Sequence, residues 1–311
     1  MARIAVFTDR YALASSFGLR TFTKYRQAAF ELGHRLDFLL RNEVKYLSSY
    51  DAVYIRTTTD PLNISYVVAR LAQMQGLRVI DDPESIRICC DKVNMYRRLL
   101  SNNVPIPRTV FLEKPEFTAQ KANELFAVLG RPLVLKAPNS CFSRFVEKAA
   151  TGEDFLKVGK KFLRRAERLI VQQYRPSKFD WRVVILDGKV LSVVKYIFAP
   201  DGWRVMDRAA NGETYKVVGV PIEKADPSLL QTALAATNSI GKSLYGVDLK
   251  EMDEGYLVIE VNDNPDIDAG NEDQCSPDIF RQIIEYLAGG VTADKVTGGK
   301  TGEKSGSLAI S

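Results

Sequence analysis

The feature that most constrains the fold is a change in strand pattern along the chain. Over about 1–90, short apolar runs such as residues 3–8 (RIAVFT) alternate with amphipathic stretches such as Phe17 to Leu32. This alternation predicts a small parallel sheet with helices on its faces. From Trp181 onward the apolar runs come in pairs joined by tight turns, which predicts antiparallel hairpins instead. The chain should therefore combine an α/β unit with α+β modules.

The first unit continues through residues 51–58 (DAVYIRTT), a helix over about 61–75 that begins at Pro61, and the strand LRVI. Ligands of parallel sheets bind beyond the carboxyl ends of the strands. The polar residues expected at these ends are Asp9, Arg10, Arg56 and Thr57.

A second unit is expected from Asp91 onward. A basic helix over Asp91 to Asn102 precedes VPIPRTV, whose two prolines favour an extended entry into a strand. A helix near 118–129, the strand PLVLKAP, a basic helix and the strand RLIVQQY follow. This order predicts a small α+β module.

Two hairpins are predicted in the last part of the chain. In WRVVILDGKVLSVVKYIFAP, the turn Asp187-Gly188 joins two apolar strands, and both turn residues tolerate positive φ. The second hairpin is YGVDLKEMDEGYLVIEVN, and helices are expected over Ser228 to Ser243 and near Asp278 to Leu287.

We expect four segments in all. They are an α/β domain at 1–90, a central module at 91–171, a C-terminal module with a metal site at 172–288, and a disordered tail at 289–311 that is rich in Gly, Lys and Thr.

Composition excludes several kinds of chemistry. The chain has one histidine, His34, which argues against zinc–histidine clusters, histidine triads and histidine general bases. The four cysteines lack metal-ligand spacing, so we expect reduced thiols. No apolar run near the start has the length of a signal peptide or membrane span, so we expect a cytoplasmic protein without a membrane partner.

The net charge of +5 is a mild excess. Its densest cluster alternates with apolar residues at helical spacing, so we interpret it as the solvated face of an amphipathic helix. This cluster is Lys160, Lys161, Arg164, Arg165 and Arg168. A nucleic-acid or acidic-polypeptide surface is the less favoured interpretation.

The most informative segment is YLVIEVNDNP at 256–265. Strand alternation predicts one face formed by Val258, Glu260 and Asn262, and the partner strand YGVDL should bring Asp248 to the same face. Carboxylate and amide oxygens without nitrogen or sulfur ligands suit magnesium, which completes its octahedron with phosphates and water.

This segment has two alternative interpretations. A polar strand face exposed to solvent is less favoured, because the strands are otherwise apolar and buried acids without a cation are costly. A calcium loop in DNPDIDAGNED is rejected, since Pro265 and Gly270 do not fit the EF-hand spacing.

Two lysines stand upstream, Lys92 after CCD at a helix start and Lys136 at the end of the strand LVLK. A lysine buried at a strand end must meet an anion, and a nucleotide phosphate or a structural carboxylate could each supply it. The nearby VQQY and FDWRV add a strand end for an adenine edge, Asp180 for a ribose hydroxyl and Arg182 for an anionic group.

The order DK, strand lysine, QQY, DWR, basic strand, GVDL and IEVN resembles the ATP-grasp superfamily, and within it the RimK-like glutamate ligases. The resemblance runs from about Arg3 to Leu287 and leaves out only the tail. It implies an ATP-grasp fold, in which a small N-terminal parallel α/β domain precedes two α+β modules that clasp ATP.

The resemblance also implies roles for individual residues. The expected ATP-binding residues are Lys92, Lys136, Ser140, Ser143, Gln172, Gln173, Tyr174 and Asp180. The expected ligands of two Mg²⁺ ions, for which Mn²⁺ is a substitute, are Asp248, Glu260 and Asn262. The residues expected to line an acyl phosphate are Arg182, Lys195, Arg208 and Asn211.

The implied reaction is ATP-dependent ligation of a carboxylate to an amine through an acyl phosphate. The implied partners are an amino acid and an amine, peptide or protein acceptor, with glutamate tolerated by the mild positive charge, and a homo-oligomer is compatible with the sequence. A slow or non-catalytic nucleotide-binding regulator and a phosphotransferase are the alternatives.

Two features depart from the family pattern. The loop at 138–145 (PNSCFSRF) contains no glycine, although backbone N–H groups commonly close over phosphates at this point. Gln173 also stands where related sequences carry glutamate, which keeps an acceptor for the adenine amine but removes a charge.

Overall fold

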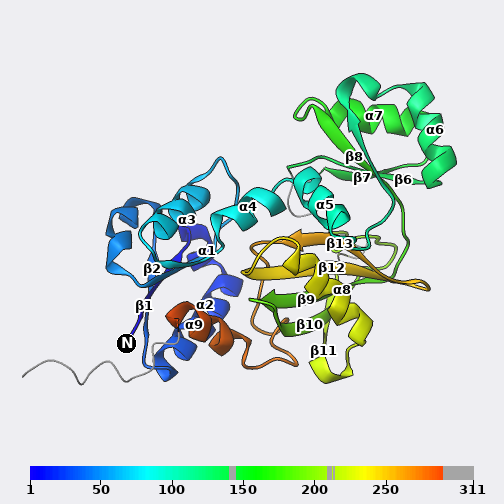
Figure 1. The fold of residues 1–311 in the computed structure, drawn as a ribbon. Coiled ribbons are helices and arrows are strands. Elements are labelled where there is room, and N and C mark those ends of the chain that lie inside the picture. Colours follow the sequence, from blue (N-terminus) through cyan, green and yellow to red (C-terminus); the bar gives the residue numbers. More distant parts are fainter. Residues whose placement is uncertain (140–144, 209–211, 213, 290–311) are drawn as a thin grey trace, which may run out of the picture.

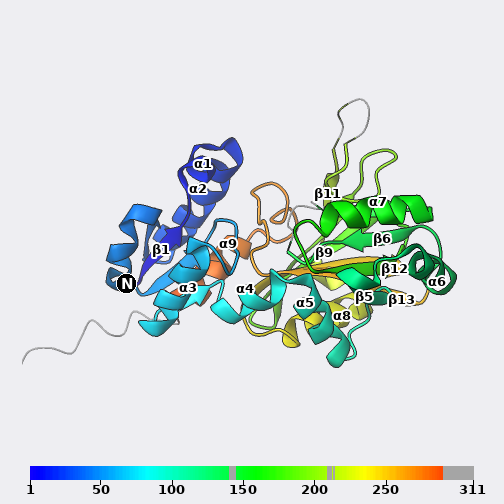
Figure 2. The ribbon, with the colours of Figure 1, turned by 90° about the horizontal axis from the view of Figure 1, so that it is seen from above.

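A computed structural model of the chain describes residues 1–139, 145–208, 212 and 214–289. The strands of this part form three sheets. Figure 1 shows the N-terminal α/β unit on one side, the module with α6 and α7 at the upper right, and the five-stranded sheet below that module. Figure 2, seen from above, confirms that these last two modules lie over one another while the N-terminal unit stands beside them.

The N-terminal unit is built on a parallel sheet of order β2-β1-β3-β4, as expected. Its strands are β1 (Arg3–Phe7), β2 (Arg35–Leu39), β3 (Ala52–Ile55) and β4 (Arg78–Ile80). Its helical elements are α1 (Arg10–Ala14), α2 (Ser16–Glu31), the 3-10 helix η1 (Arg41–Ser49) and α3 (Ile64–Met74). The C-terminal helix α9 (Ile279–Ala288) returns to pack on α2, with the rings of Tyr25 and Phe280 4.9 Å apart.

The expected start of the third helix at Pro61 is wrong. The helix begins at Ile64, because Asn63 caps it by accepting a hydrogen bond from the Ser65 N–H. A further helix, α4 (Pro83–Cys89), was not expected; it is capped by Asp82, which accepts from the N–H groups that follow. Asp91 caps α5 (Lys92–Ser101) in the same way.

The central module is a four-stranded sheet of order β5-β8-β6-β7 with antiparallel pairing. Its strands are β5 (Thr109–Glu113), β6 (Leu133–Lys136), β7 (Val146–Ala149) and β8 (Arg168–Gln173), and its helices are α6 (Ala119–Leu129) and α7 (Gly152–Phe162). The basic cluster only begins on α7: Lys160 and Lys161 are exposed there, while Arg168 already belongs to β8.

The C-terminal module is an antiparallel sheet of order β11-β10-β9-β12-β13. Its strands are β9 (Phe179–Leu186), β10 (Lys189–Ile197), β11 (Lys216–Val220), β12 (Leu244–Met252) and β13 (Gly255–Asn262), and α8 (Pro227–Asn238) packs beside them. Both predicted hairpins are present, and the first turns at Asp187 (φ 48°) and Gly188 (φ 77°).

Each hairpin contains one β-bulge that changes which residues share a face. The pairing of β12 with β13 shifts beyond Asp248, so that Asp248 lies opposite Glu260 while Leu249 lies opposite Val258. As a result Val258 joins the buried core with Val261, while Glu260 points to the other side. The expectation that Val258 shares a face with Glu260 is therefore wrong.

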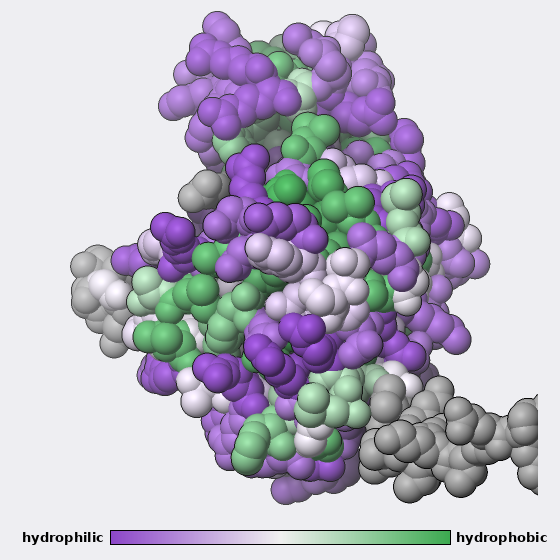
Figure 3. Space-filling model, turned by 90° about the vertical axis from the view of Figure 1, so that its left-hand side faces the viewer, coloured by the Kyte–Doolittle hydropathy of each residue, from purple (hydrophilic) through white to green (hydrophobic). Residues whose placement is uncertain are grey.

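The molecule is well packed in four apolar cores and mostly hydrophilic on the face shown in Figure 3, where apolar residues form small separated patches. Among the described helices, none has both the length and the apolar character needed to cross a membrane.

Candidate active site

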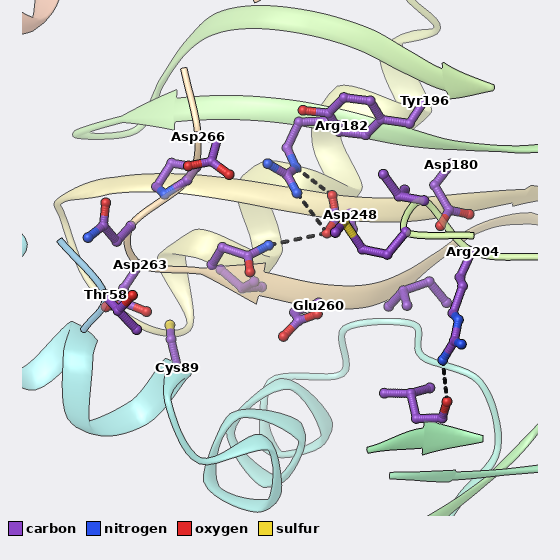
Figure 4. Close-up of a pocket in the computed structure, with 18 of the residues that line it drawn as sticks. Thr58, Cys89, Asp180, Arg182, Tyr196, Arg204, Asp248, Glu260, Asp263 and Asp266 are labelled. Carbon is purple, nitrogen blue, oxygen red and sulfur yellow. Dashed lines mark hydrogen bonds and ion pairs between the residues drawn. The ribbon is translucent and has the colours of Figure 1, made fainter. Parts of the chain in front are cut away.

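A cavity of about 610 Å³ lies where the three modules meet. Its wall includes the strand end of β8, the cavity-facing sides of β9, β12 and β13, and the carboxyl edge of the N-terminal sheet. Segments from all three sheets therefore contribute to one site, and Figure 4 shows part of its lining.

The three residues expected to hold adenine line this cavity together. Gln172, the residue before the last of β8, is buried, and its Nε2 donates to Thr109 Oγ1 at 2.9 Å. Gln173 and Tyr174 follow it along the wall, and the Tyr174 ring meets Trp203 edge to face. A strand end and two aromatic rings thus form one end of the cavity.

Lys136 is buried at the end of β6, as its sequence context predicts. Its Nζ donates to the hydroxyl of Tyr96 at 2.7 Å, and Tyr96 in turn donates to the Ile259 carbonyl at 2.5 Å. Burial lowers the pKa of Lys136 to about 8, because an ammonium group is poorly solvated there. An anion in the cavity would therefore stabilise the protonated form of Lys136.

Lys92 occupies the first turn of α5, where the Asp91 cap fixes the helix start. Its Nζ lies 2.5 Å from Glu260 Oε1, and its side chain is almost fully buried. Burial alone would raise the pKa of Glu260, but the Lys92 ammonium outweighs it and holds the pKa below its usual value. Glu260 is therefore an ionised carboxylate facing the cavity.

Asp248 lies opposite Glu260 across the hairpin, on the same side of the sheet. The guanidinium of Arg182 on β9 forms two hydrogen bonds with Asp248, one of them at 3.0 Å from Nη2 to Oδ2. Asn262 Nδ2 also donates to Asp248 Oδ2 at 3.2 Å. Figure 4 shows Arg182 and Asp248 facing each other above Glu260.

The donor set formed by Asp248, Glu260 and Asn262 fits magnesium. These three residues line the cavity together with Lys92 and Lys136, and Lys92 is paired with Glu260. Magnesium takes oxygen ligands and keeps waters or phosphates on its remaining positions. Within the described residues, no group of three or more His, Cys, Asp or Glu side chains gathers as a metal cluster.

Asp180 also lines the cavity, but it is already paired. Its Oδ1 lies 2.7 Å from Nζ of Lys250, a residue two positions beyond Asp248 on β12. Burial raises the pKa of Asp180, and Lys250 offsets part of that rise. The Asp180 carboxylate is thus held in place by Lys250.

Two expected site residues do not lie in the cavity. Lys195 packs on the opposite face of the sheet, with its Nζ 4.3 and 4.4 Å from the ring centroids of Phe179 and Trp181. A bulge in β10 after Val190 pairs Lys195 with Trp181 and so turns it away. Arg208 is exposed and does not contribute to the cavity wall.

Three further expectations concern Ser140, Ser143 and Asn211. These positions, together with most of the loop at 138–145 and the expected tail from residue 290, fall outside the described residues.

The sequence did not point to three residues that shape the site. Tyr96 links Lys136 to β13, Lys250 holds Asp180, and Tyr196 donates to Glu272 while its ring lies under Arg182. Lys250 could have been found, because it shares the strand face of Asp248 at a spacing of two. Tyr96 and Tyr196 carry no such signal.

Residues from the N-terminal sheet also reach the site. Arg56, just beyond β3, donates from Nη1 to Asn264 Oδ1 at 2.6 Å and to the Pro265 carbonyl at 2.8 Å. Thr57 Oγ1 donates to Asp9 Oδ2 at 3.2 Å. The carboxyl edge of this sheet is thus joined to the segment that follows β13.

Comparison with known proteins identifies the family and the fold. A family model described as a RimK-like ATP-grasp domain matches residues 89–287. A probable alpha-L-glutamate ligase 1 of Pseudoalteromonas atlantica is 26% identical over 283 residues, which cover 85% of this chain and 89% of that protein. A protein of the same name from Shewanella denitrificans is 28% identical over 245 residues, covering 78% and 79%.

Two solved structures show the same fold. The RimK domain protein ATP-grasp of Sphaerobacter thermophilus has a TM-score of 0.66 at 18% identity and covers 93% of this chain and 100% of its own. The D-alanine–D-alanine ligase of Bacillus anthracis complexed with ATP has a TM-score of 0.69 at 16% identity, covering 93% and 96%. The expected ATP-grasp fold is confirmed, and the expected class of enzyme, a ligase, agrees with these names. The chain belongs to the RimK-like ATP-grasp family.

Proposed function

We propose that the chain is an ATP-dependent carboxylate–amine ligase that forms an amide bond through an acyl phosphate. The observation that carries this proposal is the meeting of Lys92 and Lys136 with Asp248, Glu260 and Asn262 in one cavity. Cations that suit phosphate and oxygens that suit magnesium are the two halves of a phosphoryl-transfer site.

We assign the nucleotide to the cavity between the central and C-terminal modules. Gln172, Gln173 and Tyr174 would hold adenine, and Asp180 would accept a hydrogen bond from ribose. Lys92 and Lys136 would bind the phosphates. The segments 91–171 and 172–288 would then act as the two modules that clasp ATP, with 1–90 completing the site.

Magnesium, held by Asp248, Glu260 and Asn262, would neutralise the negative charge of the terminal phosphates. Glu260 would then bind magnesium and no longer Lys92, and Lys92 would bind a phosphate. Arg182 would remain beside Asp248, where its guanidinium can orient the substrate carboxylate or the phosphate attached to it.

The proposed reaction has two steps. A carboxylate oxygen attacks the terminal phosphorus of ATP, and the bond to the bridging oxygen breaks as ADP leaves with the electron pair. The amine nitrogen then attacks the acyl carbon, the carbon–oxygen bond to phosphate breaks, and phosphate leaves. The amine releases one proton to a neighbouring carboxylate or to the departing phosphate. The amide, ADP and phosphate are the products.

The substrates proposed at this level are an amino acid, such as the glutamate named for the relatives, and an amine, peptide or protein acceptor. A screen of carboxylate and amine pairs for phosphate release, followed by product mass, tests the ligase proposal. A product with the mass of an amide supports it. Tight ATP binding without phosphate release from any pair would favour a regulatory protein, and a stable phosphorylated product would favour a phosphotransferase.

A further inference from the structure

A short chain of hydrogen bonds lies behind the part of the cavity wall to which we assign adenine. Thr109 on β5 is directly opposite Gln172 on β8 in the antiparallel pairing of these strands, so the two side chains share a face. Oγ1 of Thr109 lies 2.6 Å from the Pro107 carbonyl oxygen and 2.9 Å from Nε2 of Gln172. Pro107 and Gln172 line the cavity, whereas Thr109 does not.

The direction of these hydrogen bonds is fixed by Pro107. A carbonyl oxygen only accepts, so the single hydroxyl proton of Thr109 is donated to Pro107. The hydroxyl oxygen then has only lone pairs left for the Gln172 amide. Nε2 of Gln172 can donate to it, whereas Oε1 in the same place would set two acceptors against each other. The Thr109 hydroxyl thus determines which way the Gln172 amide is turned.

Oε1 of Gln172 remains able to accept a hydrogen bond from a ligand. It lies 3.4 Å from the hydroxyl oxygen of Tyr96. Tyr96 has one hydroxyl proton, and the Ile259 carbonyl oxygen at 2.5 Å is the nearer acceptor. The same hydroxyl oxygen accepts from Nζ of Lys136 at 2.7 Å. Because the Tyr96 proton is committed to Ile259, the Gln172 oxygen keeps its capacity as an acceptor.

Purine nucleotides differ in the group that such an oxygen would meet. Adenine carries at C6 an amino group that donates hydrogen bonds, whereas guanine and hypoxanthine carry at C6 a keto oxygen that only accepts. Gln172 is buried, so little water could separate a keto oxygen from its Oε1, and the contact would leave two acceptors without a donor. An amide held in this direction therefore favours a 6-amino purine.

We propose that Thr109 is a positioning residue that sets the base selectivity of the nucleotide site, by holding the Gln172 amide with its oxygen toward the base. The proposal rests on the proposed function, in which Gln172 holds adenine. Without the Thr109 hydroxyl the amide can turn, and Nε2 can then donate to the Tyr96 oxygen or to a keto group at C6. The selectivity thus depends on a side chain that does not line the cavity.

The test is calorimetric titration of ADP and of inosine diphosphate into the magnesium-saturated chain. Inosine diphosphate carries the keto group at C6, with a hydrogen on N1, and is otherwise the same molecule as ADP. We expect the wild-type chain to bind ADP at least about tenfold more tightly than inosine diphosphate. Equal affinities for the two nucleotides would overturn the proposal.

Variants of Thr109 assign the selectivity to its hydroxyl. Thr109→Val should lower the ratio of the two affinities by about tenfold, with weaker binding of ADP and tighter binding of inosine diphosphate. Structural damage would weaken both nucleotides alike, so movement in opposite directions is specific to a turned amide. Thr109→Ala lacks the hydroxyl without adding a methyl group and should lower the ratio in the same way. A wild-type ratio in either variant would contradict the proposal.

Two further variants serve as controls. Thr109→Ser keeps the hydroxyl and should keep the wild-type ratio. Thr23→Val, at an exposed position on α2, should change neither affinity.

The inference and the proposed function fail in different ways. If ADP binds but the ratio survives loss of the Thr109 hydroxyl, the inference is wrong and the nucleotide site stands. If neither nucleotide binds the wild-type chain, the nucleotide assignment is wrong and the inference fails with it. The ligase reaction is decided separately, by the screen for phosphate release.

Discussion

The Nζ atom of Lys92 at the start of α5 lies 2.5 Å from Oε1 of Glu260 on β13, although 168 residues separate them in the chain. Both side chains face the cavity that the central and C-terminal modules share. A cation suited to phosphate is thus paired with an oxygen suited to magnesium. We interpret the pair as the resting arrangement of a nucleotide site, in which each partner serves as a counter-ion for the other.

The first prediction concerns Glu260. Glu260→Gln should lower metal-dependent phosphate release by at least about a hundredfold, because an amide is a much weaker magnesium ligand than a carboxylate. The fold should persist, as judged by circular dichroism. Glu167→Gln, on an exposed side chain of the central module, is the control and should retain full activity.

The second prediction concerns Lys136. Lys136→Ala should weaken ADP binding by about tenfold or more, since a buried ammonium forms a charge-assisted bond with phosphate. Lys157→Ala, on the exposed side of α7 in the same module, should bind ADP normally. Equal ADP affinities for the two variants in calorimetry would remove Lys136 from the site.

The third prediction is a pH dependence of nucleotide affinity. The pKa of Lys136 is lowered by burial to about 8, and phosphate binds the protonated form. ADP affinity should therefore be level below about pH 8 and fall above it, approaching tenfold per pH unit, because binding must then take up a proton. The Lys136→Ala protein should lack this bend, and a wild-type affinity independent of pH up to about 9.5 would contradict the assignment.

The fourth prediction concerns stability. Burial raises the pKa of Glu272 to about 7, and hydrogen bonds from Tyr196 and the Asp268 N–H only partly offset this. Because the folded-state pKa lies above the ordinary value of 4.5, the folded protein holds the proton more firmly than the unfolded chain. The unfolding free energy should therefore decrease as pH rises from about 4.5 to about 7, by a few kcal/mol.

Glu272→Gln separates this group from the other acids. Urea unfolding of the variant should show a shallower decline across the same pH range, because the amide does not titrate. Glu285→Gln on α9 should keep the wild-type slope. A Glu272→Gln protein with the wild-type slope would mean that Glu272 is not the titrating group.

Local signals predicted much of the fold. The alternation of strands and helices gave the parallel N-terminal sheet, and Asp187-Gly188 marked the first hairpin turn because both residues adopt positive φ. The start of α3 was predicted wrongly. Pro61 is a residue suited to the first turn of a helix, but Asn63 supplies the cap and the helix begins after it.

Strand faces were the main source of error. A bulge adds one residue to a strand, and because side chains alternate, every residue beyond it changes face. One bulge moved Lys195 away from Arg182, and another separated Val258 from Glu260. Nothing in an apolar run such as KVLSVVKYI indicates where the extra residue will be accommodated.

Contacts between distant segments were beyond sequence reasoning. Lys92 pairs with Glu260, and Arg56 donates a hydrogen bond to Asn264 in the segment after β13. Both contacts depend on how separate modules pack. The residue types were recognisable in each segment by itself, but their partners were set by tertiary structure.

The most direct test is a crystal structure of the chain with magnesium and a non-hydrolysable ATP analogue. We expect oxygen atoms of Asp248, Glu260 and Asn262 at about 2.0–2.1 Å from magnesium. We also expect Lys92 to have left Glu260 for a phosphate. A nucleotide bound elsewhere, or one bound in this cavity with the Lys92–Glu260 pair intact and no magnesium on these residues, would contradict the proposed site.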